Sequence, residues 1–430
     1  MKRPVVLMLS YLYPPSPEVG AMRVSEFARY LPEFGWQPVV VTSRDGLDVA
    51  WSDPSYATRT PPTIFEHLIG WFRRSGRSLG PYRFSEATGT VQSSSRLGLA
   101  LGRMAMVWLR GWWAVHAIPT ALRLGRSRHI CAIYVNCGPF GPTLTGLVAK
   151  LLLHRPLVLD FRDAWSLDPY GRFGPVGRTW SWLWESVILR FTDRLLLTSP
   201  SARTAYLKRY PFLHGRCHCL PNGYDEAFFA NLPKPTDPYP GRTLGYAGTI
   251  YPERFEPLLR GLALVPDLTL HLYGRIFAPE ALWALADRYN LRPRIVYHGF
   301  LPRRELLSEL QRLRALVLTQ EFWGATTVSP IAGKTYEYLR LGLPILGLMP
   351  AGDNATLLRR YGKNVVVVTR PAPRSVARGV RIVLGKRRLE ARGLPFSRQT
   401  LTGQLATILD SLPPTTRSAP GRDLPSRSGA

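Results

Sequence analysis

Two charged residues in the segment from Ser329 to Asp353 have the types and spacing to bind a phosphorylated sugar. On a helix, Lys334 and Glu337 would share one face near its N-terminal end. Free amides and a partial positive charge at such an end favour a phosphate. The lysine would contact the phosphate and the glutamate a ribose diol. The same spacing also fits an exposed ion pair that contributes about 0.3 kcal/mol to helix stability.

The neighbouring residues predict the elements that would position this pair. Ser329 followed by Pro330 is typical of an N-cap and a first helical residue. Gly342 and Pro344 then end the helix. Residues 344–348 are wholly apolar, which is typical of a strand buried on both faces of a parallel sheet.

A second candidate site lies near the N-terminus. Residues 5–9 and 39–42 predict strands on either side of a helix over 22–34, which is the order of a parallel βαβ unit. Gly20, in the loop before that helix, would let the backbone approach a ligand at the carboxyl edge of the sheet. A plain turn at Gly20 is the alternative.

Polar residues appear abruptly after the predicted strand at 157–161. Arg162 and Asp163 end it, at the edge where open parallel sheets carry their chemistry. Asp163 could position an acceptor hydroxyl or take its proton. A carboxylate that caps the following turn is the alternative.

A glycine also ends the predicted strand at 244–247. The loop at Gly248 and Thr249 could close around a phosphate, and Arg254 lies just beyond it. A solvated surface arginine is the alternative. This strand begins a second run of strand–helix alternations, which predicts a doubly wound domain.

The length of 430 residues is too great for one ordinary core and suits two domains of roughly 200 residues each. The segment between them is rich in proline and glycine, as linkers are. We predict an N-terminal Rossmann-like domain over residues 1–228, a linker over 229–241 and a second Rossmann-like domain over 242–395. A helix over 396–412 would pack back on the first domain, and residues 413–430 would form a disordered tail.

The composition limits the classes of partner. Lys and Arg number 56 against 29 Asp and Glu, and the net charge of +27 would suit nucleic acid, an anionic membrane or a phosphorylated substrate. Four cysteines without zinc or CxxC spacing fit a reducing cytosol. The sequence has no P-loop, nucleophile elbow or metal-binding motif, so a site without metal or cofactor is expected.

Residues 43–125 predict a variable insertion that contains one long helix over 97–124. Along that helix Arg96, Arg103 and Arg110 form one stripe, and the opposite side is apolar, with Leu97, Leu101, Met104, Trp108 and Trp112. Such a helix is typical of a membrane interface, and packing on its own domain is the alternative. A central arginine costs at least about 2.5 kcal/mol in a bilayer, so no membrane-spanning helix is expected.

The motif K-T-Y-E-Y-L-x-x-G-x-P-I-L at residues 334–346 resembles the donor-site helix of retaining glycosyltransferases, in particular glycosyltransferase family 4. The resemblance implies an α/β fold of two Rossmann-like doubly wound domains that face each other across a cleft (GT-B). It implies that Glu337 binds the nucleotide ribose, which requires a carboxylate turned to the cleft and without an ion pair in its own domain. Many members carry another glutamate eight residues earlier, where this chain has Ser329.

Two N-terminal motifs support the same resemblance. Y-P-P-x-x-x-x-G-x-x-R at residues 13–23 is similar to the opening of many family members, and D-F-R-D-x-W at residues 160–165 resembles a segment of one branch. In the family the glycine loop faces the donor diphosphate and the acceptor. The residues thereby assigned to substrate are Gly20, Arg23, Gly248, Thr249, Arg254, Ser329, Lys334 and Glu337, and those assigned to catalysis are Arg162 and Asp163.

These features together predict a glycosyltransferase that moves a sugar, with retention of anomeric configuration, from a nucleotide-diphosphate sugar to a glycan or lipid-linked acceptor. The expected location is cytoplasmic, peripheral on the inner face of a bacterial membrane, in cell-surface polysaccharide synthesis. A nucleotide-sugar epimerase of the same fold, a basic nucleic-acid-binding protein and a membrane-bound scaffold without catalysis are the alternatives. Basic residues spread along helices beside the tryptophans at 108–113 favour lipid over nucleic acid.

Overall fold

The computed structural model describes residues 3–14, 19–43, 57–60, 82–85, 90–93, 96–169, 174–230, 232, 235, 237–322, 328–390 and 393–413. The chain divides into two compact units. The first unit is drawn from residues 1–162, 183–196 and 404–430, and the second from residues 163–182 and 197–403.

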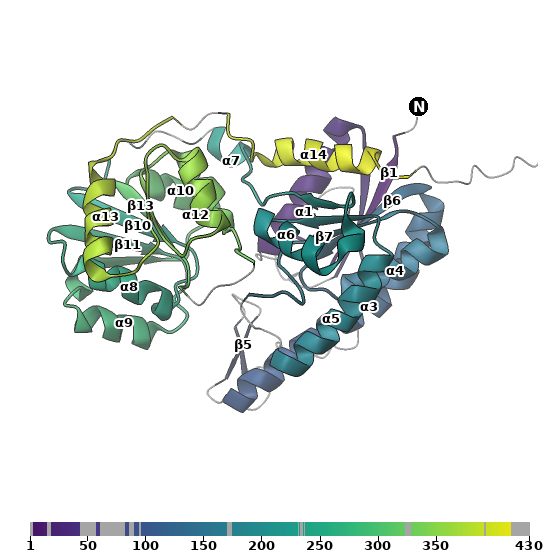
Figure 1. Ribbon diagram of the computed structural model, residues 1–430, viewed down its shortest axis with the longest axis horizontal. Coiled ribbons are helices and arrows are strands. Elements are labelled where there is room, and N and C mark those ends of the chain that lie inside the picture. The colour runs from purple at the N-terminus through teal and green to yellow at the C-terminus, as the bar shows by residue number, and fades with distance from the viewer. Residues whose placement is uncertain are drawn as a thin grey trace, which may run out of the picture. The chain divides into compact units, whose positions relative to one another are not determined.

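The N-terminal half of the chain builds a seven-stranded sheet (Figure 1). Its strands are β1 (Val5–Ser10), β2 (Gln37–Thr42), β3 (Ala57–Arg59), β6 (Ile130–Cys137), β7 (Leu157–Phe161), β8 (Arg194–Leu197) and β9 (Cys217–Cys219). The order is β3-β2-β1-β6-β7-β8-β9, and β1 pairs in parallel with both β2 and β6. A separate antiparallel pair consists of β4 (Tyr82–Ser85) and β5 (Thr90–Ser93).

Helices cover both faces of this sheet. The helix α1 (Val19–Tyr30) follows β1 and continues as the 3-10 turn η1 (Leu31–Phe34), which Gly35 ends with a left-handed φ of 85°. The helices α3 (Arg96–Ser127) and α4 (Pro142–Leu153) precede β6 and β7. Along the strand order, the connection from β1 to β2 runs in one direction, and the later connections to β6 and β7 run in the opposite direction. Right-handed crossovers therefore place α1 opposite α3 and α4 (Figure 1).

Further helices of this half are α5 (Gly174–Arg190), α6 (Pro200–Arg209), η2 (Pro211–Leu213) and α7 (Ala227–Ala230). Two buried hydrogen bonds hold α3 in place: Trp113 Nε1 donates to Thr60 Oγ1 at 3.0 Å, and Thr145 Oγ1 donates to the Ala114 carbonyl at 2.6 Å. The last helix, α14 (Arg398–Asp410), ends at a carboxylate that accepts a hydrogen bond from Trp36 Nε1 at 2.9 Å.

The C-terminal half builds a six-stranded parallel sheet in the order β12-β11-β10-β13-β14-β15. Its strands are β10 (Arg242–Ala247), β11 (Leu268–Tyr273), β12 (Ile295–Gly299), β13 (Ala315–Thr319), β14 (Ile345–Leu348) and β15 (Val365–Val368). Its helices are α8 (Pro252–Leu262), α9 (Pro279–Arg288), η3 (Arg292–Arg294), α10 (Arg303–Gln311), α11 (Gly333–Leu341), α12 (Asp353–Tyr361) and α13 (Pro373–Gly385).

Two apolar layers, one on each face, bury this sheet. In β13, Ala315 and Val317 pack in the layer with α8 and α13, whereas Leu316 and Leu318 pack in the layer with α10, α11 and α12. This alternation is the period of two that a strand covered on both faces requires. Both layers hold the carboxyl ends of the strands, and the loops that follow them, in fixed places.

Two parallel sheets with helices on both faces confirm the predicted α/β fold class. The predicted N-cap at Ser329 is wrong, because α11 begins at Gly333, after Ala332. The predicted helix over 97–124 is confirmed as α3, although the side chains of residues 96–110 lie outside the described residues. Most of the insertion at 43–95 and the tail at 414–430 also lie outside them, and the described parts of that insertion are strands.

Candidate functional site

In the second unit, Lys334 lies over the loop that follows β10. Its ammonium donates to Tyr246 Oη at 2.6 Å and stands 3.8 Å from the centre of that ring. A Cβ at Gly248 would come within 2.5 Å of Lys334 Nζ, so the glycine leaves the space that the ammonium occupies. Tyr246 Oη in turn donates to the Thr249 carbonyl at 2.9 Å. Lys334, Gly248 and Thr249, predicted separately, are therefore brought together.

Buried hydrogen bonds fix this arrangement. Tyr338, one turn after Lys334 on α11, accepts a hydrogen bond from the Ala247 amide at 2.8 Å. Burial raises the pKa of the Tyr338 phenol well above its usual range, so the hydroxyl stays protonated. This contact ties α11 to the end of β10. The residue before α11 is Ala332, which has no side chain to accept a hydrogen bond from the first amides of the helix.

The loops after β10 and β11 pack backbone against backbone. Gly248 and Gly274 have φ values of +131° and +114°, which L side chains rarely adopt. A Cβ at Gly274 would lie 2.4 Å from the Gly248 carbonyl oxygen. The Gly248 amide donates to the Tyr273 carbonyl at 2.9 Å. Two glycine turns at adjacent strand ends thus pack backbone against backbone, and the Gly248 turn lies beside Lys334.

The Arg254 guanidinium lies at the first turn of α8 and is already paired. Its Nε and Nη2 contact Glu321 Oε1 at 2.5 Å, and the guanidinium stacks over Tyr251 at 4.4 Å from the ring centre. Glu321 is nearly buried, and its Oε2 has no hydrogen-bond partner among the described residues. An anion at Arg254 would therefore have to share the guanidinium with this carboxylate.

The Glu337 carboxylate also carries an ion pair within its own unit. Its Oε1 accepts a hydrogen bond from Arg303 Nη2 at the start of α10, and that guanidinium lies 5.2 Å from the centre of the Phe228 ring. The expectation of a carboxylate without such a pair is wrong. The pair forms because α10 and α11 pack on the same face of the sheet, which sequence spacing could not show.

Ser329 contacts a different helix from the one predicted. Its Oγ accepts a hydrogen bond from the Asp353 amide at 3.1 Å, at the first residue of α12. A Cβ at Gly352 would lie 2.3 Å from the same oxygen. Ser329 therefore caps α12, and the close contact explains why a glycine precedes that helix.

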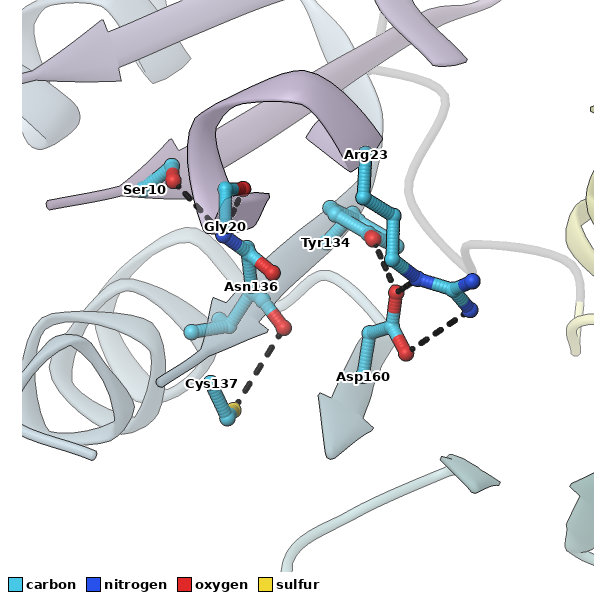
Figure 2. A network of polar contacts seen from close by, with 8 residues as sticks. Ser10, Gly20, Arg23, Tyr134, Asn136, Cys137 and Asp160 are labelled. Carbon is cyan, nitrogen blue, oxygen red and sulfur yellow. Dashed lines mark hydrogen bonds and ion pairs between the residues drawn. The ribbon is translucent and has the colours of Figure 1, made fainter. Parts of the chain in front are cut away.

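In the first unit, a buried network lies beneath the turn that contains Gly20 (Figure 2). Arg23 Nε and Nη2 donate to Asp160 at 2.7 and 3.2 Å, and the Tyr134 hydroxyl donates to the same carboxylate. Burial, and then the charge of Asp160, raise the pKa of Tyr134 well above its usual range, which keeps the donor protonated. Arg23 and Asp160 are 1% and 0% exposed. The sequence resemblance had assigned Arg23 to substrate. Its guanidinium is instead buried in the pair with Asp160, so Arg23 is a structural partner.

A second part of the network holds the start of α1 (Figure 2). Asn136 Nδ2 donates to Ser10 Oγ at 2.9 Å and to the Gly20 carbonyl at 3.3 Å, and Ser10 Oγ donates to the Leu12 carbonyl at 2.6 Å. These contacts fix Gly20 against the carboxyl ends of β1 and β6. The Gly20 turn is therefore a rigid part of the sheet edge.

The space left by Gly20 holds the Arg162 side chain. A Cβ at Gly20 would come within 1.9 Å of Arg162 Nη1, and one at Gly138 would lie 3.7 Å from the guanidinium. The two predicted residues Gly20 and Arg162 are thus adjacent. Asp163 follows directly and is partly exposed. A guanidinium beside the first turn of a helix, at the carboxyl edge of a parallel sheet, suits an anionic or polar ligand.

Sequence reasoning missed three partners: Asp160, Tyr246 and Arg303. Asp160 gave a signal, because it is a charged residue inside the otherwise apolar strand β7. Tyr246 and Arg303 gave none, since their roles depend on the packing of separate segments. No three His, Cys, Asp or Glu side chains are grouped to hold a metal ion in the described part of the chain. None of the described helices combines the length and apolarity needed to cross a membrane.

Comparison with known proteins agrees with this architecture. Residues 20–223 match the family model of the glycosyl transferase 4-like domain. Among solved structures, HepE (Alr3699) of Anabaena in complex with UDP-glucose has a TM-score of 0.58 and 16% identity, covering 95% of this chain and 100% of that chain. Sucrose-phosphate synthase of Thermosynechococcus elongatus has a TM-score of 0.55 and 16% identity, covering 95% of each chain.

A third similar structure is the lipopolysaccharide outer core galactosyltransferase WaaB in its apo form, with a TM-score of 0.56 and 12% identity, covering 95% of this chain and 99% of that chain. No protein of curated function matches the sequence. At these identities the solved structures establish the GT-B fold.

Proposed function

We propose that this protein is a retaining glycosyltransferase that moves a sugar from a nucleotide-diphosphate sugar to a glycan or lipid-linked acceptor. The observation that carries the proposal is the convergence of Lys334 with the glycine loop at Gly248 and Thr249. A single cation, a backbone loop and the uncapped start of a helix together suit a diphosphate. The family match over residues 20–223 and the structural similarity to HepE, solved with UDP-glucose, support the same substrate class.

In this proposal the second unit stabilises the leaving group. The Lys334 ammonium and the first amides of α11 face the diphosphate as negative charge develops on it during transfer. Tyr246 holds the ammonium by both its hydroxyl and its ring. The lysine is therefore oriented before substrate binds, and little reorganisation is needed in the transition state.

The Arg303–Glu337 pair does not meet the condition of an unpaired carboxylate that the sequence analysis set for ribose binding. We propose instead that Glu337 binds the ribose diol while Arg303 holds one of its oxygens. An ionised carboxylate has two oxygens and about four acceptor sites. Arg303 occupies Oε1, so the diol would use the remaining acceptor sites. Arg303 then acts as a positioning residue, because it fixes the rotamer of Glu337 before the donor arrives.

On the acceptor side, the proposed groups are Arg162 and Asp163. Arg162 lies against Gly20 at the start of α1, and Asp163 would orient an acceptor hydroxyl. The departing phosphate would assist deprotonation of that hydroxyl, so no protein nucleophile is required. The proposed place is the inner face of a bacterial membrane, in cell-surface polysaccharide synthesis, which the net charge of +27 favours.

The test is a thermal-shift panel of UDP-, GDP- and dTDP-sugars on the full-length protein, followed by titration of the best donor. Glu337→Ala is expected to weaken that donor about tenfold, or about 1.4 kcal/mol. Glu305→Ala, at an acidic residue in the first turn of α10, is the control and should leave the affinity unchanged. If none of the nucleotide sugars stabilises the protein, the proposal is wrong. If the protein epimerises the donor in the absence of any acceptor, the protein is an epimerase and the transferase proposal is wrong.

A further inference from the structure

The helix α5 is apolar on the side that faces away from its own fold. Trp180, Leu183 and Val187 are 71%, 47% and 43% exposed, and Phe191, just past the helix end, is 41% exposed. Their spacing of three and four residues places them on one face. The opposite face, with Ser181, Glu185, Ile188 and Leu189, is buried. The helix therefore has one stripe for its own domain and a second apolar stripe without a partner among the described residues.

Further exposed apolar side chains lie at the end of a neighbouring helix. Lys150, near the end of α4, forms an ion pair with Asp193, and Asp193 also accepts a hydrogen bond from the Leu157 amide. These contacts bring the C-terminal ends of α4 and α5 together. Leu151 and Leu152, at the end of α4, are likewise exposed. Single exposed apolar residues are ordinary, but a contiguous patch marks an interaction surface.

The charges around the stripe favour an anionic partner. Arg190 is exposed on α5 and lies three residues after Val187, next to the stripe. The one carboxylate of α5, Glu185, is fully buried, and Asp193 is engaged by Lys150. Arginines beside an apolar, tryptophan-bearing face are the combination that binds the boundary between lipid headgroups and acyl chains.

We propose that this face, formed by Trp180, Leu183, Val187 and Phe191, docks the protein on an anionic lipid bilayer. The apolar side chains enter the headgroup boundary, and Arg190 contacts lipid phosphates. A second copy of the chain is disfavoured, because two arginine-bearing faces of a protein with net charge +27 would repel. The docking does not depend on glycosyl transfer, and it places the anchor on α5, whereas the sequence had placed it on α3.

The test is flotation of the full-length protein with phosphatidylglycerol-containing vesicles and with pure phosphatidylcholine vesicles, without nucleotide sugar. The variant is Trp180→Ser/Leu183→Ser/Val187→Ser, which changes exposed side chains only. Phe300→Ser/Ile382→Ser is the control, because both of these residues are also exposed and lie on other elements, just after β12 and on α13. The wild type and the control should float with the anionic vesicles, and the triple variant should partition more than about tenfold less.

Arg190→Glu should reduce the preference for anionic over zwitterionic vesicles while the melting temperature stays unchanged. Three results would overturn the proposal: a wild type that binds neither vesicle, a triple variant that floats as well as the wild type, or a triple variant that changes only the sedimentation of a dimer to that of a monomer. The last result would assign the face to a second copy. Because none of these assays includes a donor, their outcome is separate from that of the transferase proposal.

Discussion

Each half of the chain pairs arginines with carboxylates near its candidate site, and the pairs of the two halves are buried to different depths. In the first unit, Arg23 and Asp160 are sealed beneath the turn at Gly20, with Tyr134 as a further donor. In the second, the pairs Arg303–Glu337 and Arg254–Glu321 are less deeply buried, and Glu337 lies on the same helix as Lys334. The difference is burial: the first pair can only support the fold, whereas the second set can exchange partners with a ligand.

The largest expected effect is the loss of folding stability when the buried Arg23–Asp160 pair is broken. Asp160→Ala leaves the Arg23 guanidinium buried without its carboxylate, which should cost about 3–5 kcal/mol of stability. Asp287→Ala, in an exposed pair with Arg292 at 3.2 Å, should cost less than about 1 kcal/mol. Urea unfolding of both variants measures the difference. Similar losses for the two would mean that burial does not set the role of the first pair.

A smaller effect, in the second unit, depends on pH. His271 and His298 lie within 3.0 Å of each other between Tyr239 and Tyr273, near Glu309 and Arg312. Burial, and then the charge of His298, lower the pKa of His271 from 6.5 to about 4. The unfolded chain therefore binds more protons in this range. The contribution of His271 to the free energy of unfolding is therefore fully present above pH 6.5 and is lost as the pH falls towards about 4.

The expected loss is on the order of 2 kcal/mol. It is measured by urea unfolding at a series of pH values, and His271→Phe should make the profile flatter. An equally steep profile in that variant would assign the loss to other groups.

A still smaller effect on stability is expected at Gly20. In Gly20→Ala the new methyl must displace the end of the flexible Arg162 side chain, at a cost of at most about 1 kcal/mol. Turnover should fall nonetheless, because Arg162 leaves the turn. Gly111→Ala, with nothing within 4 Å of the added atom, is the matched control and should keep full turnover. Turnover in Gly20→Ala equal to that of the control would remove Arg162 from the site.

The sequence predicted the fold and much of the site from local patterns. The apolar runs that became β1, β7, β10 and β14 lie within a residue or two of the predicted positions, and the nearby pairs Lys334 with Gly248 and Gly20 with Arg162 follow from strand ends meeting at one edge. The predictions that were wrong concern contacts between segments that lie far apart in the sequence. The Arg303–Glu337 pair joins two helices, and Ser329 caps α12 because the chain folds back on Gly352.

The exposed face of α5 could not be predicted from the sequence either. The apolar periodicity of α5 describes a helix with two apolar stripes, and a sequence alone does not tell which one its domain covers. The structure shows that Ile188 and Leu189 face inwards while Trp180 and Val187 face outwards. The motif at residues 13–23 likewise assigned Arg23 to substrate, and its burial against Asp160 argues against that assignment.

The central claim is that Lys334, at the start of α11, binds the diphosphate of a nucleotide sugar. Isothermal titration of UDP-glucose, the compound held by the similar HepE structure, tests it with wild type, Lys334→Ala and the exposed control Lys363→Ala. If UDP-glucose is not the best donor of the panel, the best one takes its place. We expect at least about tenfold weaker binding, or about 1.4 kcal/mol, for Lys334→Ala only. A folded Lys334→Ala protein that binds the donor as tightly as the wild type would contradict it.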